Sequence, residues 1–172
     1  MTAVSLAAGA EPSFVTRIPG FQDLYQRHSQ AVYRTALRVT GNAADAEDVL
    51  QSVFLRILDR QKNVDPSWSP ESYLRRAATN ASIDLLRRKA ASQETAMEEG
   101  REYGGREGTL LLKERLRRAL AKLPQAEAEL FVLCYLEGYS YEELAEMFEV
   151  ERGTIASRLF RTRAVLRNDL NE

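Results

Sequence analysis

Apolar residues recur at intervals of three and four over most of the chain, which is the spacing of one face of a helix. The first such stretch runs from Phe21 to Val39, and Gly41-Asn42 follows it as a helix stop. A second stretch begins at Asp45, where acids in the first turn favour the positive end of the helix dipole. We therefore expect two amphipathic helices before residue 60.

Two prolines and the only tryptophan lie between Gln61 and Pro70, and this composition predicts a loop. A third helix is expected from Pro70 or Glu71 to about Ala90, because proline is favoured at the first helical position. Its packing residues keep helical spacing, and they are Leu74, Ala78, Ile83 and Leu86.

The composition changes between residues 91 and 109, where Gln, Glu, Gly, Ala and Arg replace large apolar side chains. The glycines of this stretch disfavour a stable helix and its acids outnumber its bases, so we interpret it as an acidic flexible linker. Beyond it, an amphipathic helix from Leu110 to Leu123 ends at Pro124, and another over 126–137 ends at Gly138.

Residues 138–166 have the pattern of a helix-turn-helix. Ser140 can cap a first helix, and Glu143 stands three residues further on, which is the spacing of a capping box. A second helix follows at once, and Ile155, Leu159 and Leu166 fall on its inner face.

The pattern shows no strand and no internal repeat, so the predicted fold is all-α, with two small helical domains. The division we expect is a flexible N-terminal tail (1–19), a helical domain (20–90), the acidic linker (91–109) and a helix-turn-helix domain (110–172). Domains of this size leave surfaces that partners can complete.

The 172 residues carry a formal net charge of −1, so the chain lacks the overall basic balance of a simple DNA-binding protein. Its charges are segregated, however. Between Arg152 and Arg167 there are five arginines and no acid. Between Arg75 and Lys89 there are five basic residues and a single acid, Asp84. Acids collect at 45–48, in the linker and around 142–151. Separate basic and acidic surfaces indicate more than one kind of partner.

One cysteine and one histidine allow neither a disulfide nor a Cys/His metal cluster within the chain. His28 has no nucleophile pattern beside it, Cys134 lies in an apolar stretch, and no glycine-rich phosphate loop occurs, so we expect no enzyme activity and no cofactor. No apolar run reaches the roughly 18–20 residues of a membrane span, and residues 1–10 lack the basic start of a secretory signal. A cytoplasmic protein without membrane insertion is expected.

Acids precede the turn of the predicted helix-turn-helix, and arginines follow it. This polarity suits a short helix that crosses the DNA backbone and a recognition helix that enters the major groove. Two short amphipathic helices with a charged surface are also common in other proteins, where arginines simply face water. The pattern alone leaves both interpretations open.

Four segments, taken in order, resemble the extracytoplasmic-function (ECF) group of bacterial RNA polymerase sigma factors, in the sigma-70 family. The first reads Asp45-Ala-Glu-Asp-Val-Leu-Gln-Ser-Val-Phe and is similar to the motif that binds the clamp of the largest polymerase subunit. Short acids and an amide could pair there with basic groups of a partner helix, although acids that cap a helix start explain Asp45 and Glu47 equally well. Ser52 stands where an acid is usual. The implied polymerase-binding residues are Asp45, Glu47, Asp48, Gln51 and Phe54.

The second segment, from Ser72 to Lys89, resembles the helix that opens the minus-ten promoter element. Melting requires a surface that holds single-stranded DNA better than the two strands hold each other. The resemblance implies a base contact from Asn80 and phosphate contacts from Arg75, Arg76, Arg87, Arg88 and Lys89.

The loop over 63–69 resembles the family's loop that receives a flipped base. Trp68 would either stack on DNA there or anchor the loop. Thr79 stands where relatives often have arginine, and Asp84 could pair with Arg87 or Arg88.

The third segment, from Leu116 to Glu137, resembles the scaffold that positions the final module, and the fourth resembles the helix-turn-helix that reads the minus-thirty-five element. Ala156 replaces a basic residue common in relatives, and Cys134 falls where some relatives have arginine facing DNA. The DNA-binding residues implied for this module are Arg152, Thr154, Ser157, Arg158, Phe160, Arg161 and Arg163.

The resemblance implies a transcription initiation factor that binds core RNA polymerase through its clamp and flap, contacts promoter DNA as duplex and as single strand, and helps to melt it. It also implies a linker that threads toward the RNA exit path and an anti-sigma factor as inhibitor. The alternative is a conventional dimeric helix-turn-helix regulator, which would give no role to the 45–54 motif or to the basic helix over 73–89.

Overall fold

The computed structural model describes residues 20–59, 69–96 and 107–171, and these residues form seven α-helices and no strand. The all-α prediction is therefore confirmed. The helices are α1 (Phe21–Thr40), α2 (Ala43–Asp59), α3 (Pro70–Ala96), α4 (Glu107–Lys122), α5 (Gln125–Tyr135), α6 (Tyr141–Met147) and α7 (Arg152–Asn171). The expected tail over 1–19, the loop up to Trp68 and the middle of the expected linker lie outside the described residues.

Both ends of the expected linker are helical where the structure describes them. α3 continues to Ala96, six residues beyond the predicted end at Ala90, and α4 begins at Glu107 rather than Leu110. The local sequence explains the difference, because residues 91–96 are mostly good helix formers and contain neither glycine nor proline. The glycines that suggested a linker lie further along, and Gly108 is tolerated in the first turn of α4.

α1 ends where the sequence predicts. Gly41 adopts a left-handed conformation with φ 68°, and its N–H donates to the Leu37 carbonyl at 2.8 Å. The guanidinium of Arg117, from α4, lies directly over this glycine. A Cβ at position 41 would stand 1.9 Å from Arg117 Nη2, so a larger residue would displace this guanidinium, and the left-handed backbone conformation itself favours glycine here.

The capping box before α6 is formed as predicted. Ser140 Oγ accepts the N–H of Glu143 at 3.2 Å, and Glu143 Oε2 accepts the backbone N–H of Ser140 at 2.8 Å. These two bonds satisfy donors that the helix itself leaves open. They fix the start of the short helix that precedes α7.

Two hydrophobic cores lie at opposite ends of the molecule. The first core is formed between α1, α2 and α3, and its buried residues include Val32, Ala36, Val49, Val53 and Leu74. The helix-turn-helix core is formed by α5, α6 and α7, and its buried residues include Leu130, Leu133, Leu144, Ile155 and Leu159. The apolar stripes predicted for these helices therefore face inward.

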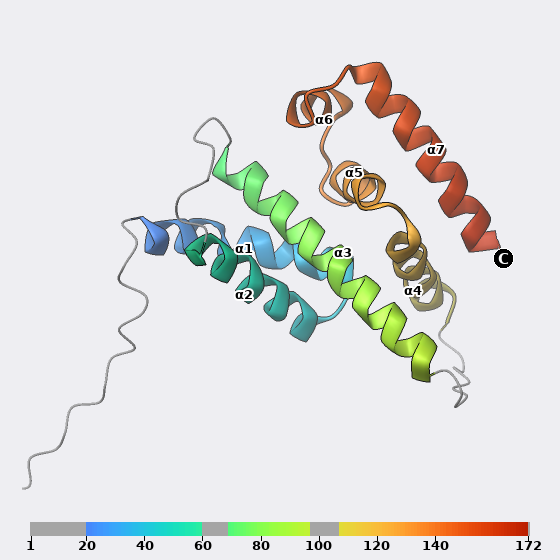
Figure 1. The fold of residues 1–172 in the computed structure, drawn as a ribbon, viewed down its shortest axis with the longest axis horizontal. Coiled ribbons are helices and arrows are strands. Elements are labelled where there is room, and N and C mark those ends of the chain that lie inside the picture. Colours follow the sequence, from blue (N-terminus) through green and yellow to red (C-terminus); the bar gives the residue numbers. More distant parts are fainter. Residues whose placement is uncertain (1–19, 60–68, 97–106, 172) are drawn as a thin grey trace, which may run out of the picture.

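A third cluster, which we call the shared core, joins the N-terminal and C-terminal halves of the chain. It brings Val39, Ile83 and Leu86 of the first three helices together with Leu120 and Leu123 of the second half. Figure 1 shows the resulting arrangement, in which α3 lies between α1 and α2 on one side and the later helices on the other. Fully burying an aliphatic side chain of this size stabilises a fold by about 1.5–3 kcal/mol, so the shared core is a substantial contact.

None of the described helices combines the length and the hydropathy needed to span a membrane.

Ser140→Ala should lower the free energy of unfolding by about 1 kcal/mol at neutral pH, because α6 loses its N-cap. Hydrogen bonds from the backbone and side chain of Ser140 lower the pKa of the Glu143 carboxyl. The stabilisation from this carboxylate is present above its ordinary pKa and is lost as the pH falls through the lowered value. Urea unfolding followed by circular dichroism should therefore show a gap between the two proteins that narrows in acid.

Ser92→Ala on the exposed part of α3 is the matched control, with an expected change of a few tenths of a kcal/mol. Equal stability of Ser140→Ala and the unmodified protein at neutral pH would contradict the role given to the cap.

Candidate nucleic-acid interface

Four of the residues predicted to bind DNA lie on the side of α3 that packs against the second half of the chain. We call Arg75, Arg76, Asn80 and Arg87 the α3 basic face. Each of them is partly buried and makes a hydrogen bond to α5, to Glu137 just beyond it, or to the turn between α4 and α5. The structure thus brings the predicted residues together, but it covers them with protein.

Glu137 is the centre of this contact. Its side chain is fully buried, and its carboxylate accepts from Arg75 Nη1 at 2.8 Å, from Arg38 Nη1 at 2.9 Å and from Thr35 Oγ1 at 2.8 Å. Burial alone would lower the pKa of the Arg75 guanidinium, but its hydrogen bonds to Glu71 and Glu137 outweigh burial and raise it. One carboxylate therefore ties α1 and α3 to the end of α5.

A second ion pair joins α3 to α5. Arg76 Nε lies 2.7 Å from Glu129 Oε1, and the Glu129 side chain is only 7% exposed. The Arg76 guanidinium also lies over the ring of Phe148, 4.6 Å from its centroid, which is within the range of a cation–π contact. Arg76 thereby contacts both α5 and the residue that ends α6.

Amide and carbonyl groups complete the contact. Gln125 Nε2 donates to Asn80 Oδ1 at 2.6 Å, and the Gln125 oxygen accepts from Arg87. Arg87 also donates to the backbone carbonyls of Ala121 at 3.1 Å and Leu123 at 2.6 Å. These carbonyls lie at the C-terminal end of α4, where the helix dipole favours a cation.

The remaining predicted residues of α3 are placed differently. Arg88 is exposed, and Lys89 forms an ion pair with Asp45 of α2. Arg87 Nη1 lies 3.9 Å from Asp84 Oδ1, in agreement with the predicted pairing. Thr79 is fully buried, and its Oγ1 has no hydrogen-bond partner among the described residues. Trp68 lies outside the described residues.

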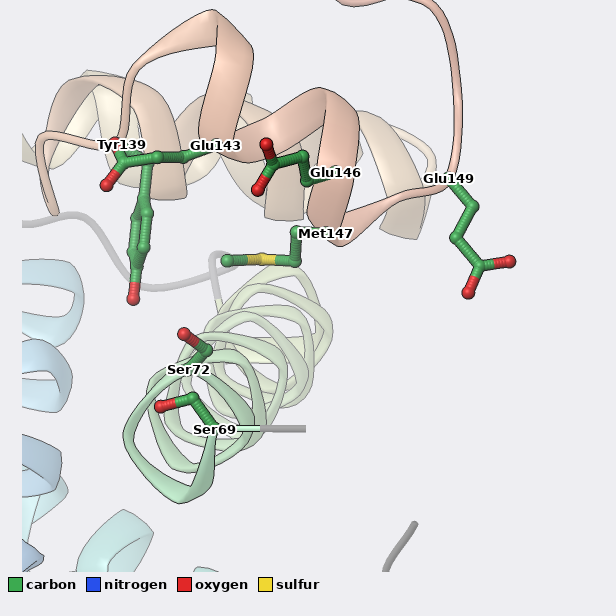
Figure 2. A pocket seen from close by; sticks show the side chains of 7 residues that line it. All are labelled: Ser69, Ser72, Tyr139, Glu143, Glu146, Met147 and Glu149. Carbon is green, nitrogen blue, oxygen red and sulfur yellow. The ribbon is translucent and has the colours of Figure 1, made fainter. Parts of the chain in front are cut away.

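A cavity of about 400 Å³ separates the start of α3 from the helix-turn-helix. Figure 2 shows Ser69 and Ser72 on the α3 side, with Tyr139 and Met147 directed toward them from the other side. The rest of the lining is acidic and comprises Glu143, Glu146 and Glu149. Carboxylates in this position repel phosphate groups, so the cavity is a poor entrance for DNA.

The predicted polymerase-binding residues of α2 fall into two groups. Glu47, Asp48 and Gln51 are exposed. Asp45 is buried against Lys89, and its backbone N–H is capped by Asn42 Oδ1 at 3.1 Å.

Phe54 belongs to the first core. Its ring packs edge-on against Phe21 at 5.9 Å and Tyr25 at 4.8 Å. These rings, Leu55 and Leu58 line an apolar hollow of about 400 Å³ that Gln51 also borders. Leu55 is 62% exposed there, so an apolar side chain stands on the surface beside the exposed polar residues of α2.

Most of the residues of α7 that were predicted to contact DNA are exposed. Thr154, Ser157, Arg161 and Arg163 are exposed, and Phe160 is 66% exposed, which is unusual for an aromatic side chain. Their side chains share the outer surface of one helix, where a DNA major groove could receive them.

Two arginines of α7 have partners within the helix-turn-helix module. Arg158 Nη2 lies 3.2 Å from Glu127 of α5, and this carboxylate also accepts from Thr162 at 3.3 Å. Arg152 is exposed and forms an ion pair with Glu142, whose carboxyl pKa is lowered by a backbone hydrogen bond and by this pair. Arg158 therefore helps to hold α7 on α5.

Cys134 is half-buried and packs against the helix-turn-helix core. Burial raises the pKa of its thiol, and the charge of Arg163 only partly opposes this. A raised pKa favours the unreactive thiol form at neutral pH. Among the described residues, no group of His, Cys, Asp and Glu side chains is arranged to hold a metal ion.

The sequence interpretation missed Gln125, Glu129 and Glu137, which it assigned to a scaffold. A signal was present, because Glu129 and Glu137 border the apolar run 130–136 with charges that a buried helix face must neutralise. Their partners lie 53 and 62 residues earlier in the chain, so local patterns could not identify them.

Comparison with known families gives two matches in chain order. The model of sigma-70 region 2 matches residues 24–92, which include α2 and most of α3. The model of sigma-70 region 4 matches residues 113–166, which include the helix-turn-helix.

The chain is also similar to individual sigma factors. It is 34% identical to the ECF RNA polymerase sigma factor SigE of Mycolicibacterium smegmatis, over 98% of this chain and 67% of that protein. It is 28% identical to the ECF RNA polymerase sigma factor SigW of Bacillus subtilis, over 88% of this chain and 89% of the relative.

Solved structures give the same fold. The sigma factor RpoE in complex with the anti-sigma factor NepR, from Bartonella quintana, matches with a TM-score of 0.53 and 22% identity, over 90% of this chain and 98% of that one. CnrH in complex with the cytosolic domain of CnrY matches with a TM-score of 0.53 and 25% identity, over 88% and 87% of the two chains. The chain thus belongs to the ECF group of RNA polymerase sigma factors, which are promoter-specific transcription initiation factors.

Proposed function

We propose that this sigma factor binds core polymerase through the exposed polar side chains of α2, reads the minus-thirty-five element with α7 and holds the opened minus-ten element on α3. The observation that carries the proposal is the separation of charge along the fold. Exposed acids stand on α2, whereas the exposed bases of α7 stand on a helix whose first sixteen residues carry no acid. Two such surfaces suit one basic protein partner and one nucleic acid.

On α2, Glu47, Asp48 and Gln51 are proposed as the direct polymerase contacts, with the exposed Leu55 beside them. A basic partner helix can pair with the acids and bury the leucine, which is the usual composition of a helix-to-helix contact. Asp45 and Phe54 are better explained as residues that position α2. Their contacts with Lys89 and with the ring cluster support that role.

On α7, Thr154, Ser157, Phe160, Arg161 and Arg163 are proposed as DNA contacts. Exposed arginines can bind phosphates or a guanine edge, and Phe160 can contact a thymine methyl. Arg158 is proposed mainly as a positioning residue because of its ion pair with Glu127. Arg152 can bind a DNA phosphate once its ion pair with Glu142 is broken.

On α3, Asn80 is proposed to contact an unpaired base, and Arg75, Arg76, Arg87, Arg88 and Lys89 to contact the strand backbone. Guanidinium groups bind phosphate oxygens in the bidentate geometry that they use for carboxylates. The two family matches support a division into a region 2 domain and a region 4 domain, which we propose as the functional halves.

We assign binding roles only, and propose that the protein acts in the cytoplasm, where its polymerase and promoters are.

An anti-sigma factor is proposed as a further partner, because the structurally similar RpoE is bound to one. The dimeric-regulator alternative is not favoured, since it accounts for only one of the two matched regions.

Run-off transcription tests the function directly. Purified core polymerase is incubated with genomic promoter fragments, with and without this protein, and start sites are mapped. We expect starts that require the protein and share two upstream elements. Tight binding to duplex DNA without polymerase, together with no protein-dependent initiation, would contradict a sigma factor and support the dimeric regulator.

Asp48→Ala combined with Gln51→Ala should weaken binding to core polymerase by about tenfold, because one charge-assisted contact is worth about 1.5–3 kcal/mol. Fluorescence anisotropy of labelled protein titrated with polymerase measures the change. Asp23→Ala combined with Gln26→Ala removes the same pair of groups from the exposed surface of α1 and is the control. Equal affinities of the two double variants would contradict the α2 contact.

Arg161→Ala should flatten the salt dependence of holoenzyme binding to duplex promoter DNA by about 0.9 in log–log slope, because one phosphate contact is lost. Filter binding over a salt series measures the slope. Arg158→Ala should lower the thermal stability of the protein in addition to any effect on DNA binding, since Glu127 loses its ion-pair partner. Arg167→Ala, exposed further along α7, is the control with the same charge change. A slope unchanged by Arg161→Ala but reduced by Arg167→Ala would show that another part of α7 meets DNA.

A further inference from the structure

The helix α1 carries a row of arginines to which the proposed function gives no role. Arg27, Arg34 and Arg38 are all exposed, and Asp23 is the only acid of this helix. Their spacings of seven and four residues place the three side chains on one ridge of the helix, about 16 Å long at 1.5 Å per residue. We call these three residues the α1 ridge.

The α1 ridge faces away from the first core and from the proposed polymerase contacts. At about 100° per residue, the buried Val32 and Ala36 lie about 140–180° around the helix from Arg27. Tyr25, which lines the apolar hollow beside Gln51, is also on the opposite side of α1. The ridge is therefore separate from the surface that we assign to polymerase.

The cations of the ridge are available to a partner. Arg27 and Arg34 make neither a hydrogen bond nor an ion pair within the part of the chain that the structure describes. Like charges on one ridge repel each other, and a partner with a series of negative charges relieves that repulsion. A nucleic-acid backbone is such a partner, and its phosphates are the groups that arginine binds without regard to sequence.

One end of the ridge lies beside the α3 basic face. Arg38 and Arg75 bind the two oxygens of the same carboxylate, that of Glu137, at 2.9 and 2.8 Å. α1 and α3 also share the first core, so the ridge and the α3 basic face are held next to each other. A strand whose bases are held on α3 can therefore continue along α1.

We propose that the α1 ridge binds the backbone of the single strand that leaves the α3 basic face, with Arg27 and Arg34 on phosphates outside the minus-ten element. This inference rests on the proposed role of α3 in holding that strand, and it adds a surface on another helix. Phosphate contacts position a strand without reading its bases. The ridge thus contributes affinity rather than sequence preference.

Arg27→Ala combined with Arg34→Ala tests the inference in the holoenzyme. Fluorescence anisotropy over a salt series measures binding of labelled non-template single strands, taken from a promoter mapped by run-off transcription. The long probe extends beyond the minus-ten element at both ends, and the short probe is confined to it. We expect the log–log salt slope on the long probe to fall by about 1.4, because each single-strand phosphate contact contributes about 0.7. Binding of the short probe should not change.

Two further variants separate a phosphate contact from other effects. Arg27→Lys combined with Arg34→Lys should restore most of the slope, because lysine also binds phosphate as a point charge. Arg118→Ala combined with Arg167→Ala is the matched control, since it removes two exposed arginines from the second half of the chain. The control should leave the slope on the long probe unchanged. Each single alanine variant of the ridge should show half the effect, so the test holds even if the double variant does not fold.

Three results would overturn the inference. They are equal slopes of the double variant and its control on the long probe, an effect that is as large on the short probe, and weaker binding of the variant to core polymerase, which would make the ridge a polymerase contact. In all three cases the unmodified holoenzyme would still prefer the minus-ten probe to a scrambled one. Loss of that preference would contradict the proposed role of α3, and this inference with it.

Discussion

The buried carboxylate of Glu137 constrains the relative placement of everything else. A charge removed from water must be paired and hydrogen-bonded, and this one finds its partners on two other helices, at Arg38, Arg75 and Thr35. Because Glu137 lies two residues after the end of α5, these bonds fix where the helix-turn-helix begins relative to α3. Figure 1 shows the result, in which α4 and α5 lie between α7 and the first three helices.

The helices themselves could be predicted because their determinants are local. Gly41 ends α1, Pro70 begins α3 and Ser140 caps α6, and in each case a few neighbouring residues are enough to define the boundary. The predicted linker was too long for a related reason. An averaged composition concealed six residues at its start that are mostly good helix formers, and α3 continues through them.

The candidate site was predictable as a set of residues but not as a surface. A motif cannot distinguish an acid that a partner binds from one that holds its own helix in place, and Asp45 and Asp48 differ in this way. Arg158 and Arg161 differ similarly on α7. The distinction depends on Lys89 and Glu127, which lie 44 and 31 residues away in sequence and meet these side chains only after folding.

The glycine at position 41 has a consequence that extends beyond the end of α1. Arg117 donates to the Val39 carbonyl at 3.1 Å, and its guanidinium lies against Gly41. A cation from α4 is therefore held at the C-terminal end of α1, the negative end of the helix dipole. The absence of a side chain at this position thereby leaves room for a guanidinium that links the two halves of the protein. A larger residue at this position would meet the Arg117 guanidinium, which would have to leave the end of α1 and give up its contact there.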